Sequence, residues 1–130
     1  MSDLLTGMSS AASGMTAQSA RLRVTAENMA NIDTPGFRRK LISFEAMVDR
    51  ADDPRAVAAG RVSLDQSPLE KVYDPAHPLA DDQGYYDGSN VKLMVEIADA
   101  REAQRSYEAN LRMFDQTRKM ITSLFELLRR

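Results

Sequence analysis

The side chains best suited to chemistry lie between residues 74 and 82, where the only histidine of the chain stands among aspartates. His77 is flanked by Asp74, Asp81 and Asp82. Imidazole and carboxylate groups can bind Zn or Mn, and histidine with aspartate and serine can support nucleophilic catalysis. However, a proline-broken acidic loop with one histidine offers no fixed ligand geometry, and no G-x-S-x-G nucleophile turn occurs. We therefore interpret His77 as a solvated loop residue and expect neither a metal site nor a catalytic site.

The other polar clusters also have ordinary interpretations. The basic triplet Arg38, Arg39 and Lys40 is typical of a solvated turn rather than of a phosphate site, and Tyr85 with Tyr86 is interpreted as a pair that anchors the loop to a helix. No G-x-x-x-x-G-K, G-x-G-x-x-G or His-Glu-x-x-His motif occurs. The chain has no cysteine, which excludes disulfides, thiolate metal sites and thiol nucleophiles. We expect neither an enzyme nor a bound cofactor.

Length and charge narrow the remaining classes of function. At 130 residues the chain has the size of one domain, and 17 basic against 19 acidic side chains give no electrostatic footprint for nucleic acid or lipid. No apolar run approaches the roughly 18 residues that span a bilayer. An aspartate stands where a signal peptide has basic residues, so general secretory export is not expected. Charge is uneven: residues 31–90 carry 7 basic and 11 acidic side chains, whereas residues 91–130 carry 8 and 6.

The elements that must position these residues are two long helices at the ends of the chain. Through residues 1–31, apolar and small residues recur in steps of three and four, the period of a helix seam that faces another helix. Gly7 and Gly14 each weaken an isolated helix by about 1 kcal/mol relative to alanine, so this helix should need a partner. The large residues expected at its packing interface are Leu5, Met8, Met15, Leu22 and Met29.

The second helix is predicted over residues 90–130. Neither proline nor glycine follows Gly88, and one three-four register continues to the end of this segment. A helix of about 40 residues is roughly 60 Å long, more than a compact domain of this size needs. A second apolar stripe broadens its face, so one face could take the N-terminal helix and another a different molecule. The interface residues expected here are Leu111, Phe114, Ile121, Phe125 and Leu128.

Residues 32–89 form an acidic middle segment rich in proline and glycine. Residues 41–48 could be a short strand or a helix, "GRVSLDQ" and "LEKVYD" read as short extended pieces, and residues 74–90 show no regular element. The segment lacks the bulky apolar residues for a core of its own, so it should lie along the helices or order against neighbours. The predicted fold is mainly α, with the two terminal helices paired as an antiparallel coiled coil and an extended-loop or short-β middle.

A sharp turn separates the first helix from this middle segment. Pro35 presets φ at the second position of a turn and Gly36 accepts a positive φ at the third, which predicts a type II turn over residues 34–37. Asn31 is predicted to cap the helix in the left-handed conformation. By itself the motif could be an ordinary helix terminator; in a chain that assembles through its terminal helices, the turn would set where the middle segment leaves them.

With these motifs in view, the sequence resembles the flagellar rod and hook axial proteins. "SGMTAQSARLRVTAENMANIDTPGF" is similar to their shared signature, in which a helix ends in Asn-x-Ala-Asn before Thr-x-Gly-aromatic. "VYDPAHPLADDQGYYDGSNV" followed by "DAREAQRSYEANLRMFDQTRKM" is similar to the proximal rod subunits of the C type. The residues that carry the first motif are Asn28, Asn31, Thr34, Pro35, Gly36 and Phe37, and those of the second are His77, Pro78, Leu79, Gly84, Tyr85, Arg105, Tyr107 and Asn110. This chain has Ser89 where those subunits usually have proline, which leaves the start of the second helix open.

The resemblance implies a structural subunit without catalytic activity. Members of this family build the tubular rod of the basal body, which spans the periplasm and links the motor to the hook and filament. Their terminal helices pair in its inner layer, and their partners are other rod subunits and further copies. They leave the cell through the flagellar type III export apparatus without a cleaved signal peptide, and their free termini are typically disordered until assembly. The alternative from another class is a soluble helical coiled-coil adaptor or signalling protein that forms a stable dimer.

Overall fold

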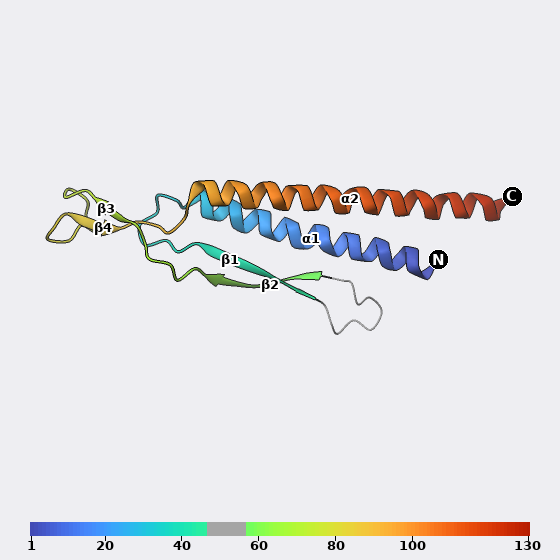
Figure 1. Cartoon of the computed structure of the whole chain (residues 1–130), viewed down its shortest axis with the longest axis horizontal. Helices are drawn as coiled ribbons and strands as arrows, with labels where there is room; N and C mark the ends of the chain where they lie inside the picture. The colour runs from blue at the N-terminus through green and yellow to red at the C-terminus, as the bar shows by residue number, and fades with distance from the viewer. Residues whose placement is uncertain (47–56) are drawn as a thin grey trace.

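The structure is a computed structural model that describes residues 1–46 and 57–130. It is an elongated molecule in which two long helices lie side by side, and the middle of the chain forms two small hairpins (Figure 1). In chain order, the elements are α1 (Ser2–Ala30), β1 (Lys40–Ala46), β2 (Val57–Leu64), β3 (Lys71–Tyr73), β4 (Tyr85–Asp87) and α2 (Leu93–Arg129). The mainly helical fold with a strand-containing middle segment is therefore confirmed. Within the described ranges, no helix has the length and hydropathy needed to cross a membrane.

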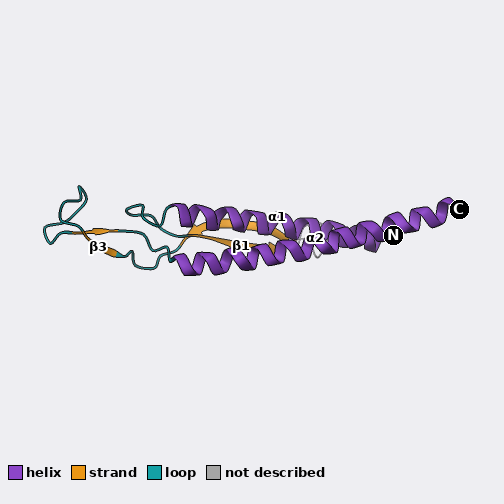
Figure 2. Cartoon of the chain, turned by 90° about the horizontal axis from the view of Figure 1, so that it is seen from above, coloured by secondary structure: helices purple, strands orange, loops and turns teal. Residues whose placement is uncertain are grey.

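The two helices run in opposite directions. Three contacts show this: Asn28 bonds Glu96, Arg21 pairs with Asp99, and Gly14 lies against Asn110. α2 has 37 residues and α1 has 29, so α2 continues past the point where α1 begins (Figures 1 and 2). The knobs-into-holes packing that defines a coiled coil stays a prediction.

The buried residues of the two helices are small or polar rather than large and apolar. In α1 they are Ala11, Ala17, Val24, Thr25 and Asn28, and in α2 they are Glu96 and Ala103. None of the ten large residues predicted for the packing interface is buried in this single chain. Six are half-buried (Met8, Met15, Leu22, Met29, Phe114, Ile121) and four are exposed (Leu5, Leu111, Phe125, Leu128). Their role in packing stays a prediction.

Gly14 shows why small residues matter between the helices. A Cβ atom at this position would lie 2.8 Å from the Asn110 side-chain nitrogen, closer than real Cβ atoms come to their neighbours. Glycine therefore permits an approach that alanine would obstruct. At Gly7, by contrast, a Cβ atom would meet nothing within 4 Å.

The middle segment forms two antiparallel hairpins in place of a single sheet. Residues 41–48 were open between strand and helix; β1 shows a strand through Ala46, and residues 47 and 48 lie outside the described residues. β1 pairs with β2, from Lys40 opposite Leu64 onwards, and this hairpin lies along α1 (Figure 1). The pairing has an irregularity between Ile42 and Phe44.

The second hairpin, β3–β4, extends beyond the ends of both helices (Figure 1). Lys71 pairs with Asp87 and Tyr73 with Tyr85. The prediction that residues 74–90 contain no regular element was therefore wrong for Tyr85–Asp87. Three residues are too few to show a period in the sequence, and this strand exists because it pairs with β3 across a 12-residue separation of chain.

The turn after α1 matches its prediction, but its cap does not. Phe37 donates its N–H to the Thr34 carbonyl at 3.2 Å, and Gly36 has φ of +73°, as a type II turn requires. Asn31 ends the helix with φ of −109°, so the left-handed cap was wrong. Its side-chain amide instead donates to the Glu27 carbonyl at 2.8 Å, which satisfies a carbonyl of the last turn without a positive φ.

Candidate functional site

A cluster of polar side chains joins the end of α1, the start of β1 and the start of α2. We call it the junction and define it by Asn28, Arg39, Asn90, Glu96 and Asp99. It forms because the turn after α1 brings Arg39 back over the first turns of α2, where two carboxylates face it. The junction therefore ties together the two helices and the first hairpin.

Glu96 is the centre of the junction. Its side chain is completely buried, and it accepts hydrogen bonds from the Arg39 guanidinium and from the Asn28 amide, the latter at 3.2 Å. Arg39 also reaches the Asp99 carboxylate at 2.7 Å. Burial by itself would lower the pKa of Arg39, but the hydrogen bond and charge of Glu96, with the charges of Asp99 and Asp65, raise it above its usual value. The guanidinium is therefore held charged where it balances two carboxylates.

Asn28 joins α1 to β1 as well as to α2. Its amide donates to the Lys40 carbonyl at 2.9 Å and accepts the Lys40 N–H at 2.8 Å, so it pairs with the backbone as a neighbouring strand residue would. The Lys40 ammonium in turn pairs with Glu27 at 2.8 Å, and that hydrogen bond and charge lower the pKa of Glu27. One amide side chain thus contacts all three elements at this point.

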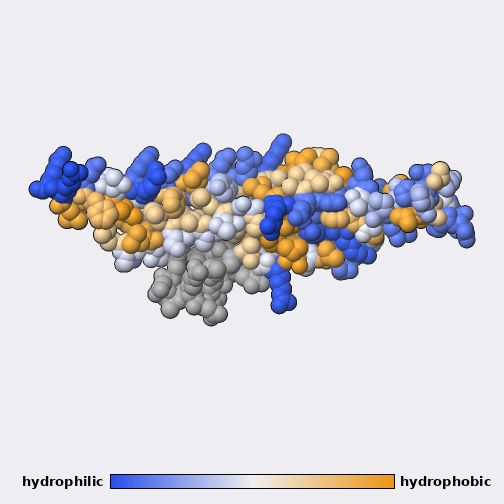
Figure 3. All heavy atoms as spheres, turned by 180° about the vertical axis from the view of Figure 1, so that it is seen from behind, coloured by the Kyte–Doolittle hydropathy of each residue, from blue (hydrophilic) through white to orange (hydrophobic). Residues whose placement is uncertain are grey.

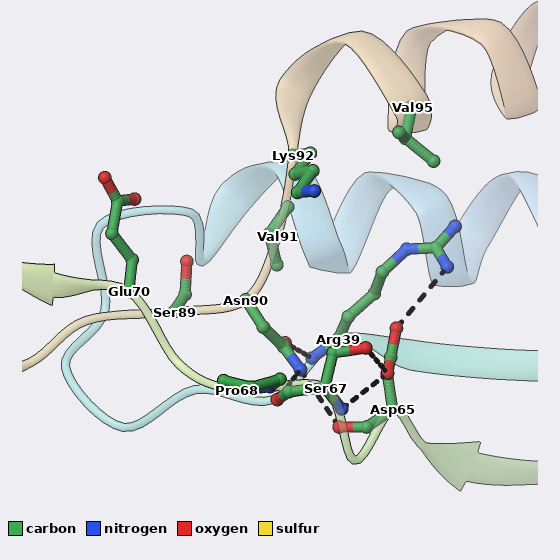
Figure 4. A pocket seen from close by; sticks show the side chains of 10 residues that line it. All are labelled: Arg39, Asp65, Ser67, Pro68, Glu70, Ser89, Asn90, Val91, Lys92 and Val95. Carbon is green, nitrogen blue, oxygen red and sulfur yellow. Dashed lines mark hydrogen bonds and ion pairs between the residues drawn. The ribbon is translucent and has the colours of Figure 1, made fainter.

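Asn90 holds the loop after β2 against the start of β1. Its amide donates to the Asp65 carbonyl at 2.9 Å and the Ser67 carbonyl at 3.1 Å, and its oxygen accepts the Arg39 N–H. Figure 4 shows these side chains converging beneath the first turn of α2. They line one side of an open groove of about 640 Å³, whose other side includes Val91 and Val95.

The turn of residues 34–37 is fastened to the segment that leaves β4. The Gly36 N–H donates to the carbonyls of Asp87 and Gly88, both at 3.1 Å. The Ser89 hydroxyl donates to the Ile32 carbonyl. The motif residues Asn28, Asn31, Thr34, Pro35, Gly36 and Phe37 therefore lie together at the end of α1, next to the junction.

The residues of the C-type motif do not form one site. His77, Pro78, Leu79, Gly84 and Tyr85 lie in or beside the β3–β4 hairpin, whereas Arg105, Tyr107 and Asn110 lie on α2. Gly84 has φ of +88°, and a Cβ atom there would stand 2.9 Å from both Tyr73 and Pro75, so glycine is required on both counts.

His77 is a packed loop residue rather than the solvated one we expected. Its ring stacks on Tyr86 with centroids 3.9 Å apart, and its Nδ1 accepts the Leu79 N–H at 3.1 Å. The sequence did not predict this contact, because Tyr86 lies in β4, a strand that its local pattern did not indicate. Among the described residues, no three histidine, aspartate or glutamate side chains are grouped to hold a metal ion.

Two further interpretations were wrong. Tyr85 and Tyr86 do not anchor the loop to a helix: their rings contact residues of the same hairpin, with the Tyr85 ring 5.0 Å from that of Tyr73 and the Tyr86 ring stacked on His77. Arg38, Arg39 and Lys40 are half-buried and bonded to three other segments, so they are not a solvated turn. The only signal for the junction in the sequence was Glu96. It is an acidic residue that lies on neither apolar stripe of the second helix, although its neighbours in the chain are apolar.

The junction contains no nucleophile paired with a base, and its charges are paired with one another. Such an arrangement fixes the relative positions of elements.

Comparison with known proteins agrees with this interpretation. Residues 8–38 match a family model described as "Flagella basal body rod protein", and residues 82–127 match one described as "Flagellar basal body rod FlgEFG protein C-terminal". The flagellar basal-body rod protein FlgC of Agrobacterium fabrum is 40% identical over 92% of this chain and 91% of its own length. The FlgC of Aquifex aeolicus is 36% identical over 97% and 98%, and that of Escherichia coli O6:H1 is 33% identical over 90% and 92%.

The chain belongs to the FlgC family. Membership confirms the resemblance drawn from the sequence motifs, and it confirms a structural rod protein rather than an enzyme. It does not favour the soluble adaptor. In this FlgC family member, the first family model covers most of α1 and the turn of residues 34–37, and the second covers β4 and most of α2.

Proposed function

We propose that this chain polymerises through its terminal helices into the proximal part of the basal-body rod, the shaft that links the motor to the hook and filament. Its partners would be further copies and other rod subunits. In this proposal, the antiparallel helices complete a coiled-coil core when copies pack together. Residues 1–31 and 90–130 form that core, and residues 32–89 form the outer segment.

The observation that carries this proposal is the exposure of the predicted seams. Phe125 is 54% exposed and Leu128 77% exposed, and Leu5 on α1 is 54% exposed. Figure 3 shows hydrophobic side chains at the surface toward the C-terminal end of α2, next to strongly hydrophilic ones. Burial of one such large side chain contributes roughly 1.5–3 kcal/mol. Ten of them, none buried here, provide a driving force for packing between copies.

Location and export route are part of the same proposal, and family membership supports the rod location. The chain would lie in the rod where it spans the periplasm, and it would leave the cell through the flagellar type III export apparatus without a cleaved signal peptide. Neither cofactor nor metal is needed for such a role. The junction would serve assembly by fixing the angle at which the hairpins leave the helical core.

A substitution in the seam tests the proposal. We expect Phe125→Ser to abolish swimming in a strain whose only copy of the gene carries it, and to leave the chain out of purified basal bodies. The matched control is Glu108→Ser, an exposed polar position of α2 that lies off the three-four register of the seam and should swim normally. Normal rods with Phe125→Ser would overturn the proposal, provided that immunoblots show equal amounts of the two variants.

A further inference from the structure

Three pairs of residues in contact between the helices recur at regular intervals. They are Asn28 with Glu96, Arg21 with Glu102, and Gly14 with Asn110. From each pair to the next, the α1 number falls by seven, while the α2 number rises by six and then by eight. All three pairs therefore belong to one antiparallel register, in which each position of α1 lies at a fixed level of α2.

A second register is compatible with the small residues of α1. Gly7 lies seven residues before Gly14, so a movement of α1 by seven residues toward the start of α2 would bring Gly7 opposite Asn110. Glycine suits this point, because a Cβ atom at Gly14 would lie 2.8 Å from the Asn110 side-chain nitrogen, which donates to the Ser106 carbonyl at 3.0 Å. The opposite movement would place the long side chain of Arg21 there. The small residues therefore leave one alternative register open.

The two registers differ in the partners that they give to Glu96. In the observed register, this fully buried carboxylate accepts hydrogen bonds from Arg39 and Asn28. In the alternative register, Arg21 would lie opposite Glu96, and Asn28 would lie beyond the start of α2. A buried carboxylate is costly unless it is paired, and each of these registers offers it an arginine. The bonds that fasten the turn of residues 34–37 to the segment after β4 favour the observed register.

We propose that Arg39 is a positioning residue that selects the register of the helix pair. By pairing with Glu96, it excludes a chain in which α1 is displaced by seven residues and Arg21 takes its place. The displacement corresponds to about 10 Å along the helix axis. It would move every apolar residue of α1 to a new level of α2. Fixing the register of packed helices is the best-attested role of buried polar groups. The inference concerns the single chain and does not depend on its assembly into a rod.

The distance between two spin labels measures the register, and the chain has no cysteine that would interfere with labelling. Ala26→Cys and Glu108→Cys place the labels at exposed positions of α1 and α2 in the full chain. We expect a single distance when no other residue is changed. Arg39→Met should add a second distance that is longer by about 10 Å, because Arg21 then supplies the charge that Glu96 has lost.

Two further variants separate a displaced helix from a loosened one. Arg39→Met with Glu96→Leu should keep the single distance, because no buried carboxylate then attracts Arg21. Gly7→Leu added to Arg39→Met should remove the longer distance, because a leucine cannot lie opposite Asn110 at so close an approach. In the observed register a Cβ atom at Gly7 meets nothing within 4 Å among the described residues. A mere loss of packing would instead broaden the distances in all variants that lack Arg39.

Arg39→Gln is the second variant, since it keeps a hydrogen-bond donor for Glu96 without the charge. It carries the same expectation if circular dichroism shows that Arg39→Met has lost its helices. An unchanged distance in a helical variant would overturn the proposal, as would a longer distance that persists with Gly7→Leu. Loss of helicity in both Arg39 variants would also overturn it, because Arg21 would then not replace Arg39. So would a chain with Arg39 intact that gives no defined distance, because it would have no register to select.

Discussion

At the scale of single residues, the junction depends on a carboxylate that has no access to water. Glu96 is 0% exposed and neutralises an Arg39 side chain that is only 16% exposed. We expect Glu96→Gln to lower the free energy of unfolding by about 2–3 kcal/mol, because a neutral amide then faces the largely buried guanidinium, which keeps Asp99 as its only close charged partner. Urea denaturation followed by circular dichroism measures this.

Glu102→Gln is the matched control for Glu96→Gln. The Glu102 carboxylate also accepts a hydrogen bond from an arginine, Arg21 at 3.3 Å, but its side chain is 67% exposed. Exposed ion pairs contribute at most about 1 kcal/mol, so this variant should be nearly as stable as the wild type. Equal losses in the two variants would show that the burial of Glu96 has no energetic consequence. The double variant Arg39→Met with Glu96→Leu should recover stability, since neither charge then remains.

The two glycines of α1 give a second contrast between single residues. Gly7→Ala adds a methyl group in open space and should stabilise the chain by about 0.5–1 kcal/mol through helix propensity. Gly14→Ala has the same propensity gain, but its Cβ atom would lie 2.8 Å from the Asn110 nitrogen. We therefore expect Gly14→Ala to be less stable than Gly7→Ala in thermal unfolding, and Asn110→Ala to remove that difference. Equal melting temperatures for the two glycine variants would show that the helices do not approach closely at Gly14.

At the scale of elements, the turn of residues 34–37 determines how the chain leaves α1. Gly36 has a positive φ, and its N–H bonds the segment after β4. Gly36→Val should cost about 1–2 kcal/mol, because a side chain in the left-handed region meets the following carbonyl. Combined with Pro35→Ala, it should impair assembly and motility while synthesis of the chain continues, as soft-agar swimming and immunoblots would show.

Gly36→Asn is the control for the turn. Asparagine tolerates a positive φ better than other residues, and a Cβ atom at Gly36 would meet nothing within 4 Å. This variant should therefore swim. Normal swimming of the Pro35→Ala, Gly36→Val variant would show that the turn does not set the geometry of the assembled subunit.

The elements could be predicted from the sequence where the signal is local. Steps of three and four residues predicted both helices, and Pro35 with Gly36 predicted the turn. The β3–β4 hairpin and the junction could not be predicted in this way, because each depends on residues far apart in the chain. Arg39 meets Glu96 across 57 positions, and Asn90 meets Asp65 across 25. The packing role of the ten large apolar residues stays a prediction, because a heptad period predicts that a face packs against another helix but does not say which molecule supplies that helix.

At the scale of the whole molecule, the packing is uneven along its length. The junction secures the start of α2, whereas small residues of α1 cover its middle. From Thr122 onwards every residue of α2 is exposed. A helix stabilised at one end should lose order progressively toward the other, since isolated helical turns are marginal in water.

Hydrogen exchange measured by mass spectrometry tests this gradient. In the purified chain at low concentration, we expect amides of residues 93–105 to exchange slowly and those of residues 116–130 to exchange rapidly. In purified rods, residues 116–130 should become protected, because other copies would then cover Leu124, Phe125 and Leu128. Uniform slow exchange in a dilute monomer would show that the chain needs no partner to complete its fold. Uniform slow exchange in a stable dimer would instead support the soluble adaptor, since that protein would already cover its seams in solution.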